Sequence, residues 1–455
     1  MVLRAGCYSV SICPLEWRYG SEELRKILRV ENFVKTMAMV ELALMEGLVE
    51  AGIAPKRLVE ELRGKIERVN ARRVYDLEKK LGHEVGALVW LLGQEVGEEY
   101  SRFIHYGATS NDIIDTAWAL IIRDALMIIK NKLKKLVSIL IKRIESEGDY
   151  VLIGRTHGQH ALPVTWGFKL ANYVYELTRC YERLVETEKR VVRLKLSGAV
   201  GTMAAWGDRA EIIVSTVSRI LGLEPHVITT QVAPRDGFAE LVCNMSILAG
   251  VLERIALEVR ELSRPEIREV SEGFIPAIGS SAMPHKVNPI LSEKICGLAR
   301  VLRGYCSTML ENIALWHERD LSNSSCERIT IPHALLVLDE MLESSIRVWS
   351  KLVVYPENMR RNLELTYNTF LSEAVVLKLV EKGVPRNEAY ERVRKLALKA
   401  IEEKRDFIEV VLADSLVSSK ITRSELKELV ESKYTGLAGE LARRVVEYAR
   451  KVLGL

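Results

Sequence analysis

Apolar residues recur at every third or fourth position along most of the chain, which is the spacing of helices rather than of strands. The longest such run extends from Asp112 to Glu147, contains no proline and is followed by Gly148. No segment shows the alternation typical of a parallel strand. The pattern predicts an all-α fold in which five long helices form one central bundle. The other four runs cover residues 167–196, 237–263, 289–316 and 331–354.

Shorter helical patterns flank these five runs. Glycine and proline break the pattern repeatedly in the first part of the chain and again around Gly383. We therefore expect an N-terminal helical domain over residues 1–108, the bundle over 109–360 and a C-terminal helical domain over 361–455. A chain of 455 residues is long for one hydrophobic core, which favours such a division. Residues 113–129 are apolar on more than one side, so we also expect burial against further copies in a homo-oligomer.

The charge of the chain is nearly balanced. Its 65 Lys and Arg and 61 Asp and Glu residues are spread throughout, without the basic stripe that nucleic acid requires. No apolar run reaches the roughly 18 residues of a membrane-spanning helix, and the segment up to Cys13 lacks the apolar core of an export signal. We therefore expect a cytoplasmic protein that binds small anionic molecules. The scarcity of Gln beside abundant Glu, Lys and Arg is typical of a thermophile.

The seven cysteines show no Cys-x-x-Cys pair and no histidine spacing typical of zinc. The chain also lacks a glycine-rich nucleotide fingerprint. We therefore predict that no metal or organic cofactor is required. Free thiols are the default expectation, but intracellular disulfides occur in hyperthermophiles, so a bridge between Cys7 and Cys13 is a further hypothesis.

Residues 279–289 read Gly-Ser-Ser-Ala-Met-Pro-His-Lys-Val-Asn-Pro. Hydroxyls, an ammonium and an amide are concentrated here between a glycine and a proline that can open the next helix, so this loop can hold an anion. The string closely resembles the signature of the fumarase/aspartase superfamily of lyases. The resemblance implies a loop that closes over a succinyl-bearing substrate, and a tetramer in which each active site draws residues from three subunits.

The resemblance also implies roles within the loop. Ser280 is the general base that takes a proton from the carbon beside a carboxylate, whereas Ser281 and Met283 bind substrate. Lys286 and Asn288 stabilise the negative charge that develops on the substrate. Because a serine hydroxyl is poorly ionised at neutral pH, Lys286 and the loop amides must activate Ser280 when the loop closes.

Residues 154–160 read Gly-Arg-Thr-His-Gly-Gln-His and interrupt the chain between two predicted long helices. They match the superfamily's Thr-His turn, which implies that His157 is the general acid that protonates the leaving group and that Thr156 helps to hold the substrate. An imidazole suits this task because its unperturbed pKa is about 6.5. Glu293 matches the carboxylate that pairs with this histidine, although a Glu early in a helix is also a favourable charge at the helix N-terminus.

The residues Thr109 and Ser110 open the helix predicted after them. With Asn111 and Asp112 they supply good N-cap side chains. They also resemble the superfamily's Thr-Ser segment, which implies that both bind a substrate carboxylate through hydroxyls and helix-start amides. The two roles are compatible.

A further set of residues bears on the group attached to the succinyl carbon. Arg319, Ser324 and Arg328 offer guanidinium and hydroxyl groups, which suit a phosphate monoester. Residues 316–328 closely resemble the corresponding stretch of adenylosuccinate lyases, which implies that these three side chains grip the 5′-phosphate. Further residues that match substrate contacts of that family are Arg18, Tyr19, His83 and Gln231.

The chain departs from that family in its first domain. Adenylosuccinate lyases often carry Arg-His-Asp where this chain reads Gly82-His83-Glu84. His83 keeps its expected contact with substrate, whereas no role is predicted for Gly82 or Glu84.

The resemblance implies an anti elimination of fumarate from adenylosuccinate, which gives AMP, and from the succinylated aminoimidazole carboxamide ribotide. Other members of the superfamily remain alternatives, namely an argininosuccinate lyase or a cycloisomerase of the carboxymuconate type. A structural relative without catalytic activity is the alternative from a different class of function.

Overall fold

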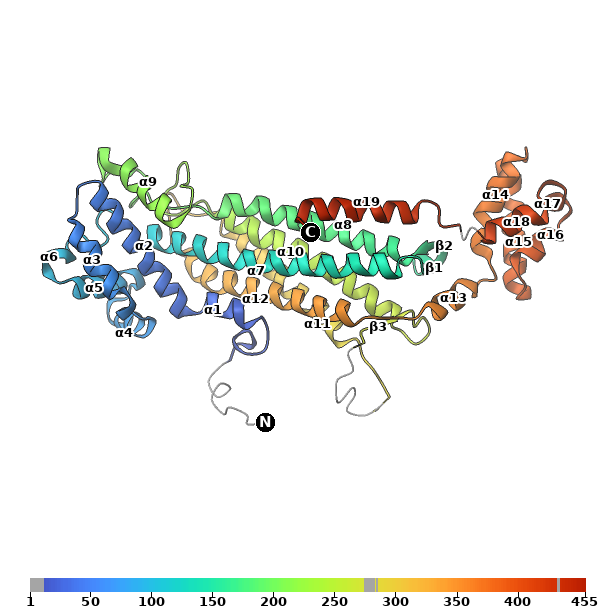
Figure 1. Cartoon of the computed structure of the whole chain (residues 1–455), viewed down its shortest axis with the longest axis horizontal. Coiled ribbons are helices and arrows are strands. Elements are labelled where there is room, and N and C mark those ends of the chain that lie inside the picture. The colour runs from blue at the N-terminus through green and yellow to red at the C-terminus, as the bar shows by residue number, and fades with distance from the viewer. Residues whose placement is uncertain (1–11, 274–282, 284, 432–433) are drawn as a thin grey trace. The chain divides into compact units, whose positions relative to one another are not determined.

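Long α-helices dominate the structure, which confirms the all-α class (Figure 1). The structure is a computed structural model that describes residues 12–273, 283, 285–431 and 434–455. All five predicted long helices are present, with bounds within about three residues of the prediction except at one end of three of them. They are α7 (Ser110–Glu147), α8 (Trp166–Val191), α10 (Arg235–Leu262), α11 (Ile290–Glu311) and α12 (Ser322–Lys351).

Close contacts divide the chain into two compact units. The first comprises the residues up to Leu133 together with Cys180–Glu253 and Lys294–Ser344. The second comprises Lys134–Arg179, Arg254–Glu293 and Ser345–Leu455. The long helices contribute to both units, and the division into three domains stays a prediction.

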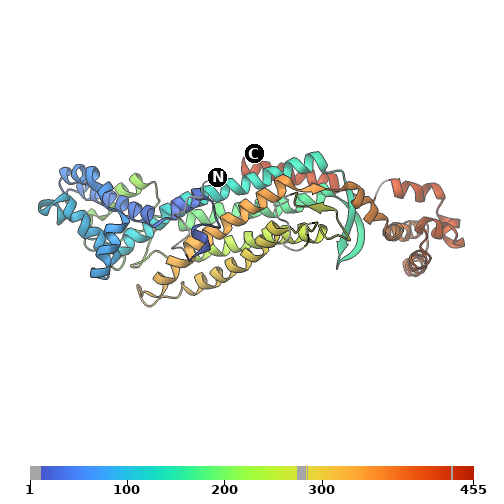
Figure 2. The same ribbon diagram turned by 90° about the horizontal axis from the view of Figure 1, so that it is seen from below.

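In the first unit, ion pairs join the long helices side by side (Figures 1 and 2). Exposed pairs such as Arg190–Glu240 contribute about 0–1 kcal/mol each, so the apolar residues between the helices must provide most of the stabilisation. Ile122, Leu248, Leu302 and Leu338 are among the fully buried side chains of these helices. The joining pairs are Lys130–Glu188 (α7–α8), Lys132–Asp339 (α7–α12), Arg190–Glu240 (α8–α10), Arg303–Glu253 (α11–α10) and Lys294–Glu340 (α11–α12).

Helix α12 begins at Ser322, well before the start predicted at residue 331. The predicted run begins one residue before Pro332, and a proline inside a helix cannot donate a backbone hydrogen bond. The helix nevertheless continues through Pro332, and only the carbonyl of Arg328 loses its helical donor. Ser324 and Arg328 therefore lie on a helix rather than in the loop expected from the sequence.

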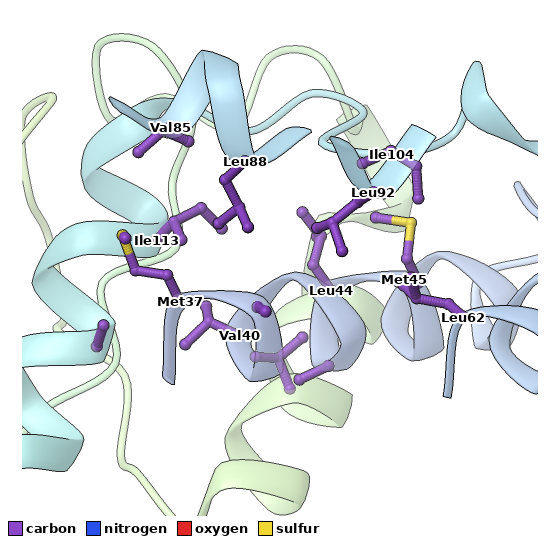
Figure 3. Close-up of a cluster of buried hydrophobic side chains, with 14 of the residues drawn as sticks. Met37, Val40, Leu44, Met45, Leu62, Val85, Leu88, Leu92, Ile104 and Ile113 are labelled. Atoms are coloured by element: carbon purple, nitrogen blue, oxygen red, sulfur yellow. The ribbon is translucent and has the colours of Figure 1, made fainter. Parts of the chain in front are cut away.

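The chain before α7 and the helix α9 (Ala210–Leu221) share one hydrophobic core in the first unit. Figure 3 shows Met37 and Leu44 of α2 on one side of this core and Leu88 and Leu92 of α5 on the other. All four side chains are fully buried. The helices before α7 are α1 (Glu22–Leu28), α2 (Val30–Glu50), α3 (Lys56–Lys65), α4 (Ala71–Leu81), α5 (Glu84–Val96) and α6 (Glu98–Ser101).

An antiparallel β-hairpin, which the periodicity did not reveal, follows α7. Strand β1 (Val151–Thr156) pairs with β2 (Gln159–Thr165), so the last residue of β1 lies opposite the first residue of β2. Only His157 and Gly158 connect the strands, and both have a positive φ, of 54° and 74°. Two central residues with positive φ define a type I′ turn. The hairpin was missed because its turn lacks the Asn-Gly or Asp-Gly signal and its strands are short.

The C-terminal segment has a separate core in the second unit, which includes Leu371, Val375 and Phe407. A short antiparallel pair, β3 (Val270–Ser271) with β4 (Val353–Val354), precedes it. In the part of the chain that the structure describes, no helix is long and apolar enough to cross a membrane. The C-terminal helices are α13 (Pro356–Glu364), α14 (Ser372–Glu381), α15 (Arg386–Glu403), α16 (Phe407–Leu412), α17 (Ser415–Lys420), α18 (Arg423–Glu431) and α19 (Ala438–Leu453).

Candidate active site

Thr109 and Ser110 lie at the start of α7, where Asp112 holds the turn in place. The backbone N–H of Asp112 donates to the Thr109 carbonyl at 2.9 Å, and the Thr109 N–H donates back to Asp112 Oδ2 at 2.8 Å. Asp112 Oδ1 also accepts from the Ser197 N–H at 2.8 Å and from Lys195 Nζ at 2.6 Å. The predicted carboxylate-binding turn is therefore fixed to the loop after α8 before any ligand binds.

The ion pair of Lys195 with Asp112 is fully buried on both sides. Burial lowers the pKa of the Lys195 ammonium, and the Asp112 carboxylate opposes that shift. Removing one partner of a buried ion pair leaves an uncompensated charge in the interior, which strongly lowers the free energy of unfolding. The pair thus makes the position of the Thr109–Ser110 turn hard to change.

His83 contacts Ser110 directly. The ring is the N-cap of α5, where Nδ1 accepts a hydrogen bond from the Gly86 N–H at 2.8 Å. The neutral ring must then carry its proton on Nε2, which lies 3.2 Å from Ser110 Oγ and donates to it. Two residues that were each predicted to bind substrate are therefore joined.

Glu84, for which the sequence predicted no role, holds Arg328. Its Oε2 accepts from Arg328 Nη2 at 2.9 Å, and its Oε1 accepts from the Tyr75 hydroxyl at 2.6 Å. The carboxylate is buried, whereas the Arg328 side chain is 56% exposed. Burial and the bond to Glu84 raise the pKa of Tyr75 far above its usual range, so its hydroxyl stays a donor. Glu84 thus fixes one end of a guanidinium that remains accessible.

A cavity of about 250 Å³ opens beside this pair, within the first unit. Apolar side chains such as Phe33 and Trp118 form much of its wall, and Ser324 and Arg328 lie on its polar side. Three buried acceptor oxygens that have no hydrogen-bond partner among the described residues belong to residues that line it. They are Asn111 Oδ1, Asn323 Oδ1 and Glu327 Oε1.

Gln231 and Arg319 form a second joined pair of predicted binding residues. Arg319 Nη1 donates to Gln231 Oε1 at 3.0 Å, and Gln231 Nε2 donates to the carbonyl of Ala199 at 3.0 Å. Burial lowers the pKa of Arg319, and its Nε is buried without a partner. A partly desolvated guanidinium with an unused donor is suited to bind an anionic ligand.

A buried network links the segments of Gln231 and Ser324. Arg235 forms ion pairs with Asp115 of α7 and, at 3.0 Å, with Glu327 of α12. Burial raises the pKa of Glu327, which the Arg235 charge opposes. These charges lie among apolar residues on long helices, and they hold three separate segments of the chain at one place.

Arg18 and Tyr19 lie in a tight turn before α1. Both backbone N–H groups donate to the carbonyl of Pro14, at 2.8 and 3.1 Å. Gly20 follows with φ 81° and a backbone N–H that donates to Glu340 of α12 at 2.9 Å. A Cβ on Gly20 would meet the Leu336 side chain at 2.8 Å, so glycine is needed here. The Gly20 N–H therefore holds the turn against α12, and the Arg18 side chain is exposed.

In the second unit, the hairpin presents Thr156 and His157 to solvent. Its β1 strand is held by Arg155, which forms two hydrogen bonds with the buried Glu269, at 3.1 and 2.7 Å. Asn362 of α13 donates to the same carboxylate at 2.8 Å. A non-glycine residue with positive φ is uncommon, and at His157 this conformation directs the imidazole outward from a rigid base.

The exit of the signature loop is fixed by Glu272. This buried carboxylate accepts from the backbone N–H groups of Leu291 and Ser292 at 3.2 and 2.7 Å, which are the first amides of α11. The Lys286 N–H donates to the Met283 carbonyl at 3.0 Å. The loop therefore enters α11 through a capped turn.

One pair of residues that was predicted to act together is not in contact among the described residues. His157 and Glu293 are both exposed, and no ion pair or hydrogen bond connects them among the described residues. Asn288 accepts from the Ile290 N–H at 2.9 Å. Ser280 and Ser281 lie outside the described residues, as does Cys7 of the proposed bridge to Cys13.

Sequence reasoning missed the acidic residues that position the binding side chains. Glu84, Asp115, Glu269 and Glu272 are all buried, and each accepts hydrogen bonds from a segment of the candidate site. The available signal was an acidic residue next to apolar ones, as at Asp115 in the run of α7. Such a residue is rarely buried unless it is paired.

Comparisons with known proteins identify the family of this chain. Residues 22–304 match the family described as Lyase, and residues 368–445 match the adenylosuccinate lyase C-terminus. The adenylosuccinate lyase of Pyrococcus horikoshii is 44% identical over 446 residues, which cover 97% of this chain and 99% of that protein. The chain belongs to the adenylosuccinate lyase family. The family member from Methanocaldococcus jannaschii is 42% identical over 96% of both chains.

Solved structures of two other enzymes share the fold of this adenylosuccinate lyase family member. A fumarate lyase from Mesorhizobium sp. BNC1 has a TM-score of 0.86 and 28% identity, covering 96% of this chain and 98% of that one. A 3-carboxy-cis,cis-muconate lactonizing enzyme from Pseudomonas putida has the same TM-score and 29% identity, covering 95% and 98%. The protein is thus a lyase with the fold of the fumarase/aspartase superfamily.

Proposed function

We propose that this chain eliminates fumarate from adenylosuccinate, which gives AMP, and from the succinylated aminoimidazole carboxamide ribotide. One observation supports this substrate class above all. The adjacent residues His83 and Glu84 contact Ser110 and Arg328, respectively. A group suited to a carboxylate and a group suited to a phosphate therefore lie at one place, as a substrate with both kinds of anion requires.

The phosphate end of the substrate is assigned to Arg319, Ser324 and Arg328. Arg319 has an unused, buried Nε, and Arg328 exposes more than half of its side chain. Guanidinium groups bind phosphate oxygens through charge-assisted hydrogen bonds. Arg18, Tyr19 and Gln231 are proposed to contact the rest of the nucleotide.

The succinyl end is assigned to Thr109, Ser110 and the hairpin residue Thr156. Ser280 takes the proton from the carbon beside the carboxylate, and the electrons of that C–H bond form the new double bond. The C–N bond breaks with its electron pair on nitrogen, and His157 donates a proton to that nitrogen. The exposed position of His157 on a two-residue turn supports this role, because a general acid must reach the leaving group.

The transition state carries additional charge on the substrate carboxylate. Lys286, Asn288 and the amides of the signature loop are proposed to stabilise it, with Ser281 and Met283 as binding contacts. A preorganised donor of this kind contributes about 3 kcal/mol in a water-excluded site. Glu293 is proposed to orient His157 and increase its basicity.

We also propose that the protein is a homotetramer with shared active sites. Large apolar side chains are exposed on the long helices of the first unit, among them Ile247, Val301 and Leu310. Several such residues on neighbouring helices mark a surface that another copy can cover. Sedimentation should therefore give a mass of about four chains, and a monomer would contradict the proposal. A cytoplasmic location, inferred from the sequence, is part of the same proposal.

The decisive experiment measures the purine absorbance while purified protein acts on adenylosuccinate. We expect conversion to AMP with release of one fumarate for each AMP. Argininosuccinate and carboxymuconate serve as competing substrates. Cleavage of argininosuccinate without conversion of adenylosuccinate, or no reaction of any substrate at micromolar protein, would contradict the proposed function.

A further inference from the structure

Cys243 and Cys306 lie in direct contact in the first unit. Cys243 belongs to α10 and Cys306 to α11, and their sulfur atoms are 2.9 Å apart although the residues are 63 positions apart in the chain. A disulfide bond is about 2.03–2.05 Å long, so a shift of about 0.9 Å would bring the sulfur atoms to bonding distance. Both residues are half-buried in the single chain.

The other described cysteines lie differently. Cys326 Sγ contacts Asn312 Nδ2 at 3.0 Å, and Cys13 Sγ lies 3.8 Å from His333 Nε2. The sulfur atoms of Cys243 and Cys306 contact each other directly.

We propose that Cys243 and Cys306 form an intramolecular disulfide that links α10 to α11. Two thiols lose two protons and two electrons as the S–S bond forms. The electrons pass by thiol–disulfide exchange to a low-molecular-weight disulfide such as oxidised glutathione, which is reduced to two thiols. The bond closes a stretch of chain that contains the whole signature loop at residues 279–289.

The energetic effect of this link comes from the unfolded chain. A cross-link across about 60 residues removes many conformations of the unfolded state, so it stabilises the folded protein. Burial and the neighbouring Cys306 raise the pKa of Cys243 to about 12, so few thiolates exist at neutral pH and formation is slow. Exchange is therefore best carried to equilibrium at mildly alkaline pH.

The proposal is independent of the proposed reaction, because neither cysteine is assigned to the active site. The full-length protein is incubated with excess oxidised glutathione, acid-quenched, alkylated under denaturing conditions and digested. We expect a peptide pair linked through Cys243 and Cys306 that separates on reduction. Alkylation of both thiols at equilibrium, or a separate glutathione adduct on either one, would overturn the proposal.

Thermal unfolding provides the second measurement. We expect the oxidised protein to unfold about 5 °C above the reduced protein, and Cys243→Ser and Cys306→Ser to lose this response to reductant. Cys326→Ser is the matched control, since it removes another half-buried cysteine of the first unit and should keep both the linked peptide and the response. A linked peptide without any change in the unfolding temperature would refute the stabilising role.

Discussion

Glu84 Oε2 accepts a hydrogen bond from Arg328 Nη2 at 2.9 Å, which joins the start of α5 to α12. Glu84 is one of the two positions, with Gly82, at which this chain departs from the Arg-His-Asp pattern of its family. The longer carboxylate reaches both Arg328 and the Tyr75 hydroxyl. The departure therefore has a structural role, which is to hold an arginine of the proposed phosphate site.

Replacing Glu84 tests this role. In Glu84→Gln the amide keeps the size of the side chain but removes its charge, so Arg328 loses the fixed position that it needs for phosphate. We expect KM for adenylosuccinate to rise about 3- to 10-fold while kcat changes by less than about 2-fold. Glu99→Gln, an exposed change nearby, is the control. A fall in kcat at constant KM would contradict a positioning role.

Arg328 should contribute directly to substrate binding. Removing its guanidinium in Arg328→Ala deletes a charge-assisted hydrogen bond, so we expect KM to rise about 10- to 100-fold. Arg328→Lys keeps the charge without the planar fork and should give a smaller increase. The matched control is Arg72→Ala, which removes a 92% exposed arginine of α4. An unchanged KM in Arg328→Ala would place the phosphate elsewhere.

Ser280 and His157 should affect turnover rather than binding. We expect Ser280→Ala and His157→Ala each to lower kcat at least about 100-fold, because each removes a proton-transfer group, while substrate still binds. Ser281→Ala serves as the comparison for the base, and single-turnover kinetics with bound adenylosuccinate provide the measurement. Near-normal turnover of Ser280→Ala together with an inactive Ser281→Ala would move the base by one residue.

The pair of His105 and Glu41 predicts a pH-dependent stability. His105 Nδ1 lies 2.6 Å from Glu41 Oε1, and Glu41 is fully buried. Burial alone would lower the pKa of His105, but the charge and hydrogen bond of Glu41 outweigh it and raise the pKa. A raised pKa means that the stabilisation is complete below the unfolded value of about 6.5 and disappears as pH rises through the folded value.

The variant His105→Asn isolates this effect, because Asn tolerates the positive φ of 62° at this position. We expect the wild type to have the larger free energy of unfolding at about pH 6, and the difference from the variant to shrink as pH rises above the folded pKa. Chemical unfolding of both proteins across this range gives the difference. A difference that stays constant from about pH 6 to pH 10 would mean that the His105 charge contributes nothing to the free energy of unfolding.

Most of the fold could be predicted from the sequence, because the spacing of apolar residues is a local property. It predicted the five long helices, with α7 the clearest. It failed at Pro332, where tertiary packing keeps α12 continuous despite the missing hydrogen bond. It also failed at the hairpin, where His157 adopts a backbone conformation that carries no composition signal.

The candidate site likewise has features that the sequence predicts and features that only the fold creates. The chemical groups proposed for the reaction come from the sequence, since strings of neighbouring residues led to the choice of Ser280, His157 and Arg328. Only the tertiary structure decided which groups meet. The contacts of Glu84 with Arg328 and of Cys243 with Cys306 join residues 244 and 63 positions apart. No local pattern encodes such contacts, because they depend on how helices distant in the chain pack against one another.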